Sequence, residues 1–424
     1  MEQYPEYRFL QSASCHTAWM QREYPALFER MREAVAQGRY EMNGAVWVEC
    51  DCNLVGGEAL IRQFLWGQRY TRDTFGVLSD CFWLPDTFGL SLIHIFHAIM
   101  DGAPVDGMPV LEWAYWWDKT LDGWYSEGLP KGLDDRQMQD YFGLAHHKQF
   151  WLAHKAEGCP KDASHGSGII TDESDYDAVR PYLLPENAVS RLASQLNALR
   201  APHESGDTLV WYTLDGAFWW PRVLFGIEQH FYSFYDYPEL YHRICDELVE
   251  WQVRMVDEMA QYVKPDFMTI AEDMSYNHGP MLSKALFDEF LLPYYRRLIP
   301  EIKKHGTRVF IDSDGDITSA VPWFIEAGID GILPLERQSG VDVAKIRDLY
   351  PDFLMIGSFD KMCMFRTPAE IRAELERLLP TIRKGKYLPA MDHQTPPGTP
   401  LENYRAYVAL MKEYGAQACA DCKK

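Results

Sequence analysis

The chain has 424 residues, 47% hydrophobic and 24% charged, which is enough to bury the core of one large barrel or of two to three ordinary domains. Its formal net charge of −21 repels phosphate backbones and anionic membrane surfaces, so we expect no nucleic-acid partner. The sequence shows neither an apolar run of about 18 residues nor a secretion signal, so we expect no membrane partner and a cytoplasmic location.

The first 96 residues predict a short α/β fragment. Apolar residues at helical spacing predict helices over residues 18–37 and 57–75. Extended patterns predict one strand over residues 40–49 and another that ends at residues 83–86. Four elements are too few to close a barrel, so we expect a sheet edge and apolar helix faces to stay uncovered.

Basic-residue usage changes near residue 96. Residues 1–96 contain eight arginines and no lysine, whereas residues 97–424 contain sixteen lysines. Beyond this seam, predicted strands cover residues 109–114, 208–215, 267–273, 308–312, 331–336, 354–359 and 387–392, and predicted helices include 283–304, 317–327, 342–349, 368–382 and 401–412. Apolar strands that alternate with helices predict a parallel TIM-type (β/α)8 barrel.

Acidic residues follow the ends of these predicted strands. They are Glu112, Asp215, Glu272, Asp273, Asp312, Glu336, Asp360 and Asp392. Parallel strands bring their carboxyl ends to one rim, where barrel enzymes assemble their active sites, so the set predicts a polar site. For any single member, a helix N-cap is an equally good interpretation.

The sharpest candidates are Asp312 and Asp314, which flank a serine, and Asp392-His393 at the last strand. Carboxylates with an imidazole suit a divalent metal, with Asp312, Asp314 and His393 as ligands. Alternatively, an aspartate here accepts hydrogen bonds from substrate pyrrole or amine N–H groups without metal, or Asp312 only caps the next helix. The cofactor is therefore either a divalent metal or none.

Three further features surround these candidates. His393 is the best general acid or base at the rim because its pKa is near neutral, although it also suits a structural hydrogen bond. Lys361 follows Asp360 and would pair with a substrate carboxylate or with a neighbour. Trp113 opens the aromatic run WAYWWD, which would stack a flat ligand or pack as a lid.

The stretch FWLPDTFG (residues 82–89) and the residues before it resemble family-38 glycoside hydrolases, the zinc-dependent retaining α-mannosidases. The resemblance implies Asp86 as nucleophile and zinc ligand, and Asp51 near the sugar. Such an enzyme also needs a second carboxyl group about 5 to 5.5 Å from the nucleophile and three or four zinc ligands. The chain does not match the rest of that family's barrel, so we expect Asp86 to be vestigial.

The later segments LDGAFWWPRVLFGIEQ, IAEDMSYNHGP, VFIDSDGD, AGIDGILPLE and MDHQTPPGTPLENY resemble the uroporphyrinogen decarboxylase-like superfamily, including its methyltransferase-related branches. The resemblance implies a TIM barrel acting as a decarboxylase or methyltransferase. Its partner would be a small-molecule substrate, tetrapyrrole- or corrinoid-related compounds included. A nonenzymatic corrinoid- or tetrapyrrole-binding barrel and an active α-mannosidase are the alternatives.

Two departures separate this chain from the named subfamilies. Uroporphyrinogen decarboxylases carry an arginine-rich RQAGRY-type motif after the first strand, where this chain reads EWAYWWDKTLDGW without arginine. Corrinoid-dependent methyltransferases of the superfamily bind zinc through His-x-Cys and a later Cys. The matching positions here read Asp312-Ser-Asp314 and Asp392-His393, so neither chemistry transfers intact.

We therefore predict a chimera of a truncated mannosidase-like fragment (1–89), a junction (90–96) with LSLIHI at 90–95, a decarboxylase-like barrel (97–418) and a polar tail (419–424). The predicted catalytic residues are Asp312, Asp314, His393, Asp392 and Glu272, and the predicted substrate-binding residues are Glu112, Trp113, Asp215, Asp273, Glu336, Asp360 and Lys361. The nine scattered cysteines are interpreted as reduced thiols, and Cys419-x-x-Cys422 stays unassigned.

Overall fold

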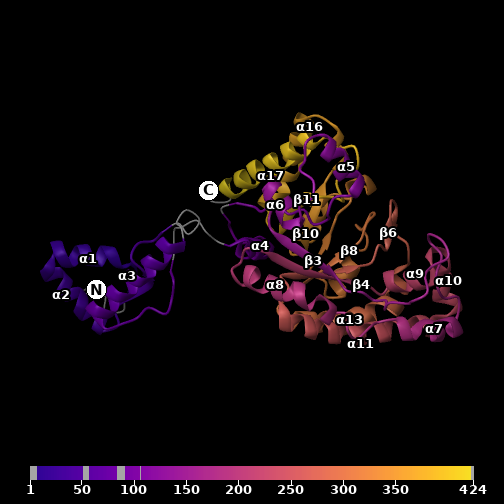
Figure 1. Ribbon diagram of the computed structural model, residues 1–424, viewed down its shortest axis with the longest axis horizontal. Coiled ribbons are helices and arrows are strands. Elements are labelled where there is room, and N and C mark those ends of the chain that lie inside the picture. Colours follow the sequence, from indigo (N-terminus) through magenta and orange to yellow (C-terminus); the bar gives the residue numbers. More distant parts are fainter. Residues whose placement is uncertain (1–6, 51–56, 84–90, 106, 422–424) are drawn as a thin grey trace. The chain divides into compact units, whose positions relative to one another are not determined.

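A computed structural model describes residues 7–50, 57–83, 91–105 and 107–421. The chain divides into two compact units, Met1–Leu90 and Ser91–Lys424 (Figure 1). None of the helices in these ranges combines the length and apolar content needed to cross a membrane.

The first unit is built on two parallel strands. Its elements are β1 (Phe9–Ala13), α1 (Ser14–Glu23), α2 (Pro25–Ala36), β2 (Tyr40–Val46) and α3 (Gly57–Phe75). β1 and β2 pair from Phe9 opposite Tyr40. Gly67 of α3 packs so tightly on β2 that a Cβ there would meet the Val46 carbonyl carbon at 2.4 Å. This close approach explains the glycine inside a helix.

Two predictions for this unit need correction. The helix predicted over residues 18–37 is two helices, because Pro25 lacks an N–H group and disfavours helical backbone at Tyr24. The strand predicted to end at residues 83–86 does not form over 77–83, and residues 84–86 lie outside the described ranges. β1 was not predicted, whereas α3 has the predicted bounds.

The second unit alternates strands and helices. Its elements are α4 (Leu92–Asp101), α5 (Asp118–Ser126), α6 (Asp135–Phe142), β3 (His147–Trp151), α7 (Glu173–Val179), α8 (Ala193–Glu204), β4 (Leu209–Asp215), α9 (Trp219–Phe225), α10 (Ile227–Asp236), α11 (Pro238–Tyr262), β5 (Phe267–Ala271), β6 (Ser275–Tyr276), β7 (Gly279–Pro280), α12 (Lys284–Leu286), α13 (Leu292–Lys303), β8 (Arg308–Asp312), α14 (Val321–Glu326), β9 (Gly331–Leu333), α15 (Val343–Leu349), β10 (Leu354–Phe359), α16 (Pro368–Arg383), β11 (Tyr387–Met391) and α17 (Leu401–Asp421).

Seven of these strands form one curled parallel sheet in the order β11-β10-β9-β8-β5-β4-β3. Spatial neighbours are therefore consecutive along the chain, apart from the small β6–β7 hairpin, and helices cover the outside of the sheet (Figure 1). This arrangement confirms the predicted α/β fold of the TIM-barrel type.

Residues 109–114 are mostly buried, as expected for the predicted strand, but they do not form a strand. Val110 and Leu111 are buried, but the segment joins its neighbours by isolated bonds. The Ala145 amide donates to the Val110 carbonyl at 2.9 Å, and the Trp113 indole donates to the Met391 carbonyl at 2.7 Å. The segment thus lies between β3 and β11. β3 was missed because HKQFW is mostly polar.

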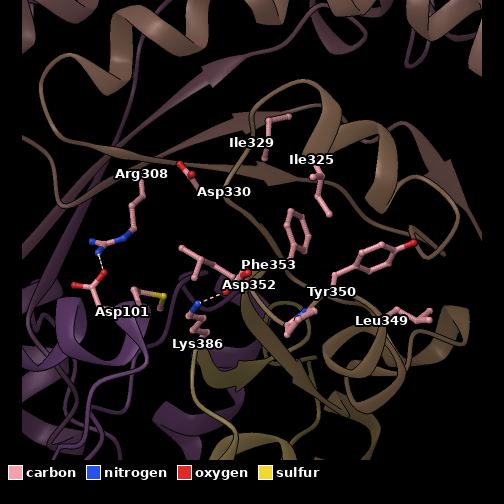
Figure 2. A pocket seen from close by; sticks show the side chains of 13 residues that line it. Asp101, Arg308, Ile325, Ile329, Asp330, Leu349, Tyr350, Asp352, Phe353 and Lys386 are labelled. Atoms are coloured by element: carbon pink, nitrogen blue, oxygen red, sulfur yellow. Dashed lines mark hydrogen bonds and ion pairs between the residues drawn. The ribbon is translucent and has the colours of Figure 1, made fainter.

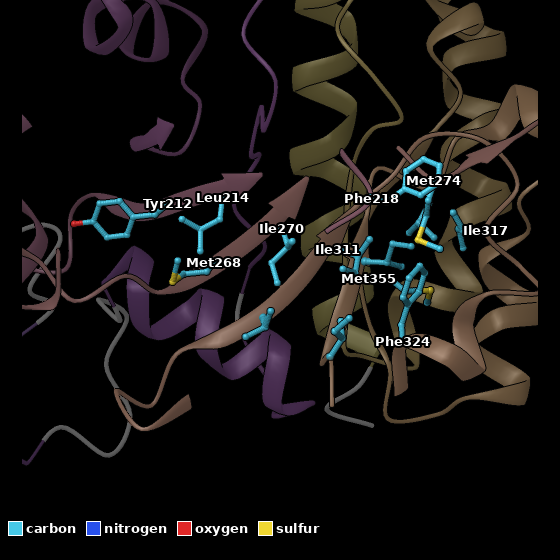
Figure 3. Packing of buried hydrophobic residues seen from close by; sticks show 14 of the residues in the cluster. Tyr212, Leu214, Phe218, Met268, Ile270, Met274, Ile311, Ile317, Phe324 and Met355 are labelled. Atoms are coloured by element: carbon cyan, nitrogen blue, oxygen red, sulfur yellow. The ribbon is translucent and has the colours of Figure 1, made fainter. Parts of the chain in front are cut away.

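Side chains alternate between two apolar clusters along each strand. Outward residues such as Tyr212, Leu214, Met268 and Ile270 (Figure 3) belong to a cluster that also contains buried residues of the outer helices. Inward residues form a second cluster that includes Trp211, Phe267, Phe310, Leu333, Ile356 and Leu388. This period of two is the side-chain alternation of a strand buried on both faces.

Helix α4 belongs to the inner cluster. Phe96 is fully buried, and its ring stacks 5.2 Å from the ring of Phe267, which itself stacks 5.0 Å from Trp211. The helix is capped by Ser91, whose hydroxyl accepts from the His94 amide. Part of the predicted junction therefore forms the first turn of a helix in the barrel, and the His94 amide takes part in capping that turn. At the other end, α17 continues to Asp421.

We predict that Phe96→Ala destabilises the barrel by about 3–5 kcal/mol, because it removes a fully buried ring from the stack. Urea unfolding of the full chain measures this loss. Phe365→Ala, at a position that is 43% exposed, is the matched control and should change the free energy of unfolding by no more than about 0.5 kcal/mol. Equal effects of the two substitutions would contradict the assignment of α4 to the core.

Candidate functional site

The candidate site lies at the carboxyl ends of the barrel strands. Asp215 at the end of β4 is in register with Ala271 of β5, and Ala271 is in register with Asp312 of β8. Neighbouring strands are about 4.8 Å apart. The two carboxylates therefore share one level of the barrel, with a small side chain between them.

Asp312 faces the barrel interior. Alternation along β8 places it on the same face as Phe310, which belongs to the inner apolar cluster. Burial, with the nearby charges of Asp273 and Asp314, raises the pKa of Asp312 well above its ordinary value. The neutral carboxyl form is therefore favoured until a ligand supplies N–H donors or positive charge.

Asp314 and His393 form the more accessible pair. The Nε2 atom of His393 lies 3.6 Å from Oδ2 of Asp314, and about a third of each side chain is exposed. Burial, and then the negative charges of Asp273 and Glu336, raise the pKa of Asp314 to about 7. Burial and the charge of Lys361 lower the pKa of His393. Asp314 thus suits proton transfer near neutral pH, where the lowered pKa of His393 favours its neutral imidazole.

Asp273 bridges the ends of β5 and β8. Its Oδ1 atom accepts from the Asp314 amide at 3.3 Å, and its carbonyl accepts from the Arg222 guanidinium at 3.2 Å. Its φ of 40° lies in the left-handed region that few residues other than glycine adopt. Burial raises the pKa of its carboxyl group. Strained backbone of this kind concentrates at functional sites.

Lys361, Glu336 and Asp392 form a bonded group beside this pair. The Nζ atom of Lys361 lies 2.8 Å from Oε1 of Glu336, and the Gly315 amide donates to Oε2 at 3.2 Å. Burial alone would raise the pKa of Glu336, but Lys361 lowers it. Asp392 is fully buried, accepts from the Lys361 amide at 3.1 Å and has a pKa raised to about 6 by burial.

Gly315 fixes the loop that carries Asp314. Its φ is 83°, and a Cβ there would meet the carbonyl carbon of Ser275 in β6 at 2.6 Å. The neighbouring Asp316 amide donates to the Tyr276 carbonyl at 2.9 Å. Only glycine fits this contact without displacing the β6–β7 hairpin.

Glu272 does not join the cluster. Its carboxylate accepts from the amides of Ala217, Phe218 and Trp219 at 2.8 to 3.0 Å and from the Tyr295 hydroxyl, so it caps the turn before α9. It is fully buried, and burial raises its pKa to about 7 despite these donors. The structure therefore gives this predicted catalytic residue a structural role.

Three other acids that were predicted to bind substrate interact with groups outside the cluster of Asp312, Asp314 and His393. Asp215 lies 3.3 Å from Nδ1 of buried His154. Glu112 accepts from the Tyr404 hydroxyl at 2.7 Å, and burial raises its pKa to about 8. Asp360 accepts from the Met362 amide at 2.8 Å and so caps a short 3-10 helix.

Only part of the predicted aromatic run is near the cluster. The Trp113 ring lies 6.4 Å from the His393 ring, edge to face, while its indole is bonded to Met391. Trp116 is buried and packs against Trp124 and Tyr404. Trp116 therefore packs in the protein interior and does not offer a surface on which a ligand could stack.

The carboxylate and imidazole groups of the cluster are not arranged to bind a metal ion. Within the described ranges, no group of three or more His, Cys, Asp and Glu side chains has an arrangement that could hold a metal ion. Asp312, Asp314 and His393 therefore do not fit the metal alternative. Asp51, Asp86 and Cys422 lie outside the described residues, and Cys419 is buried in α17.

Sequence reasoning missed two polar residues around the site. Arg222 of α9 approaches Asp273, and its guanidinium carbon lies 5.1 Å from the Trp219 ring centroid. His154 follows β3 and faces Asp215. Arg222 lies within the recognised segment LDGAFWWPRVLFGIEQ, so its position after a strand was a usable signal, whereas His154 depended on the missed strand β3.

Comparisons with known proteins separate the two parts of the chain. Residues 1–94 match the family described as "Glycosyl hydrolases family 38 N-terminal domain", and residues 170–414 match "Uroporphyrinogen decarboxylase (URO-D)". Alpha-mannosidase G of Dictyostelium discoideum is 46% identical over 91 residues, which is 22% of this chain and 8% of that protein. Two parts that match different families confirm the predicted resemblances.

The barrel has more distant relatives. Uroporphyrinogen decarboxylase of Synechococcus sp. (strain CC9605) is 27% identical over 187 residues, which is 42% of this chain and 50% of that protein. The chain thus spans about half the length of this relative. A methyltransferase from Methanosarcina mazei superposes with a TM-score of 0.58 at 17% identity, covering 77% of this chain and 99% of that chain. At this identity the likeness shows the fold alone.

We predict that Asp314→Asn flattens the pH dependence of stability. A carboxyl group whose pKa rises from 3.8 to about 7 on folding holds a proton that the unfolded chain releases, so stability falls as pH rises through this window. Between pH 5 and 8 the free energy of unfolding should fall by about 1–2 kcal/mol less in the variant, a value reduced for partial exposure. Urea unfolding at both pH values measures this.

The control for this prediction is Asp246→Asn. Asp246 lies on the outer helix α11, its side chain is 65% exposed, and it pairs with Arg297 of α13. This substitution should leave the pH dependence as in the unmodified chain. Identical pH dependence in Asp314→Asn and the unmodified chain would show that Asp314 titrates normally.

Proposed function

The chain belongs to the uroporphyrinogen decarboxylase family through residues 170–414, and on that premise we propose that its barrel is a carboxy-lyase for a small N–H-bearing substrate, tetrapyrrole-related compounds included. The observation that carries the proposal is the pairing of Asp314, whose pKa is about 7, with His393 at 3.6 Å. A carboxyl group with a pKa near the working pH is an effective general acid.

The remaining side chains have complementary roles in this proposal. Asp312 accepts hydrogen bonds from substrate N–H groups, which compensates its carboxylate for lost water. Lys361 and Arg222 are the nearby cations that would hold a substrate carboxylate. The surplus of carboxylates over these cations favours a substrate with several N–H donors.

In the proposed reaction a proton replaces the carboxylate on the substrate carbon. The bond between the substrate carbon and its carboxylate breaks, carbon dioxide leaves, and the electron pair stays on the carbon. The proton on the Asp314 carboxyl group then adds to that carbon, which leaves Asp314 ionised. His393, which is partly exposed, relays a proton from solvent to Asp314. Delocalisation into the bound substrate stabilises this electron pair, and Asp312 orients the substrate through its N–H groups.

Metal-dependent methyl transfer has less support from the donor set. Zinc that activates a thiol requires soft ligands, and the corresponding positions are Asp312, Asp314, Asp392 and His393. The methyltransferase likeness is one of fold, so methyl transfer remains the second candidate reaction of this barrel.

We predict that the full chain removes carboxyl groups from uroporphyrinogen, used as a probe under anaerobic reducing conditions. Mass spectrometry of the oxidised products counts the carboxyl groups. Asp312→Asn and Asp314→Asn should each reduce turnover at least about 100-fold, since each removes a proton or anchoring group that acts in the reaction. Asp246→Asn should match the unmodified chain.

Two results would contradict this proposal. Full turnover in Asp314→Asn would remove the general acid from the mechanism. Tight binding of the probe without carbon dioxide release would instead support a nonenzymatic tetrapyrrole-binding barrel. Binding is measured by titration of the protein's tryptophan fluorescence.

The match of residues 1–94 to the mannosidase family raises α-mannoside hydrolysis as a third candidate activity. We infer that this part is inactive, because the matched relative is covered over only 8% of its length and the chain then continues into a barrel of another family. We expect no release of 4-nitrophenol from 4-nitrophenyl α-mannoside, with zinc present. Release that is abolished by Asp86→Asn would overturn this inference.

A further inference from the structure

A cavity of about 520 Å³ lies at the end of the barrel opposite the acidic cluster. It is bounded by the start of β8 at Arg308, the start of β10 at Leu354, the residue before β11, Lys386, and the last turn of α4 (Figure 2). Its volume is within the range of small-molecule binding sites.

One side of this cavity is apolar. Ile329, Phe353 and Leu354 line it and are almost fully buried, with exposed fractions of 4 to 6%. Ile325 and Tyr350 stand at its edge, with Ile325 43% exposed (Figure 2). This surface suits one aromatic ring or a branched aliphatic group.

The other side carries two cations. Arg308 pairs with Asp101, and the Nζ atom of Lys386 lies 2.5 Å from Asp352. The cationic side chains are 22% and 26% exposed, whereas the Asp101 and Asp352 side chains are 62% and 91% exposed. The carboxylates therefore lie on the solvent side of their partners, and exposed ion pairs of this kind contribute little to stability.

The position of Lys386 is fixed by its backbone. Its amide donates to the Ile99 carbonyl of α4 at 3.1 Å, and its carbonyl accepts from the Met355 amide at 3.2 Å and from buried Arg347 at 2.7 Å. The Lys386 side chain thus starts from a fixed point at the edge of the cavity, whereas the side chain of its carboxylate partner is 91% exposed. A ligand anion can replace that partner without moving the barrel.

We propose that this cavity binds a small amphipathic carboxylate. The apolar body lies against Phe353 and Ile329, and the carboxylate replaces Asp352 on Lys386, with Arg308 as the second cation. The site is independent of the proposed carboxy-lyase function, because it lies at the amino ends of the strands.

Phenylacetate is the probe, and phenylacetamide is its neutral counterpart. In calorimetric titrations of the full chain, we expect saturable binding of phenylacetate with one site and at least about tenfold weaker binding of the amide. Asp352→Asn should tighten phenylacetate binding by about two- to fivefold, because it removes the competing carboxylate. Lys386→Met should weaken it at least about tenfold.

The matched control is Asp348→Asn, which breaks the exposed ion pair of Asp348 with Lys384, two residues before Lys386, and should leave the affinity unchanged. Ile325→Trp fills the cavity from an exposed position and should abolish binding in a folded protein. Asp314→Asn should bind phenylacetate normally, so the two sites can fail separately. Equal affinities for acid and amide, unchanged affinity in Asp352→Asn and Lys386→Met, or no saturable binding by the folded chain would overturn the proposal.

Discussion

Hydrogen bonds between parallel strands hold Asp215, Ala271 and Asp312 at one level of the barrel. The same register sets Trp211 beside Phe267, two rows nearer the amino ends, where the interior is filled by stacked rings. The register of these strands therefore places apolar side chains at one end of the barrel interior and carboxylates at the other. Because the strands are consecutive in the chain, each following loop adds its polar groups to the same rim.

Because these carboxylates are buried close together, repulsion between their negative charges changes their pKa values. Beyond the effect of burial, Asp273 and Asp314 raise the pKa of Asp312, and Asp273 also raises the pKa of Asp314, where Lys361 opposes the shift. The site thus stores protons that the unfolded chain would release. A substrate that brings N–H donors relieves the repulsion, so binding and ionisation of the cluster are linked.

The sequence predicted the barrel and its inner acids for a simple reason. An apolar run such as VFI followed at once by Asp312 marks a buried strand and its end, whatever the partners are. β3 was missed because its inward residues are polar, and the buried His147 ring is accommodated by stacking on the Trp211 and Tyr115 rings, at 5.2 and 5.6 Å. Glu272 and Asp273 were equivalent in sequence, but neighbours at a strand end face opposite sides, so only Asp273 reaches the cluster.

Helix α4 has a practical meaning for anyone who wishes to study the barrel without the first unit. The domain boundary predicted from the sequence suggests trimming the chain at residue 97, yet such a cut would delete the Ser91 cap, the first turn of α4 and the Phe96 ring. The trimmed product would expose Phe267 and lose the end of its aromatic column, and its aggregation would be mistaken for an intrinsic defect of the barrel. A cleavage site placed before residue 91 keeps that column whole.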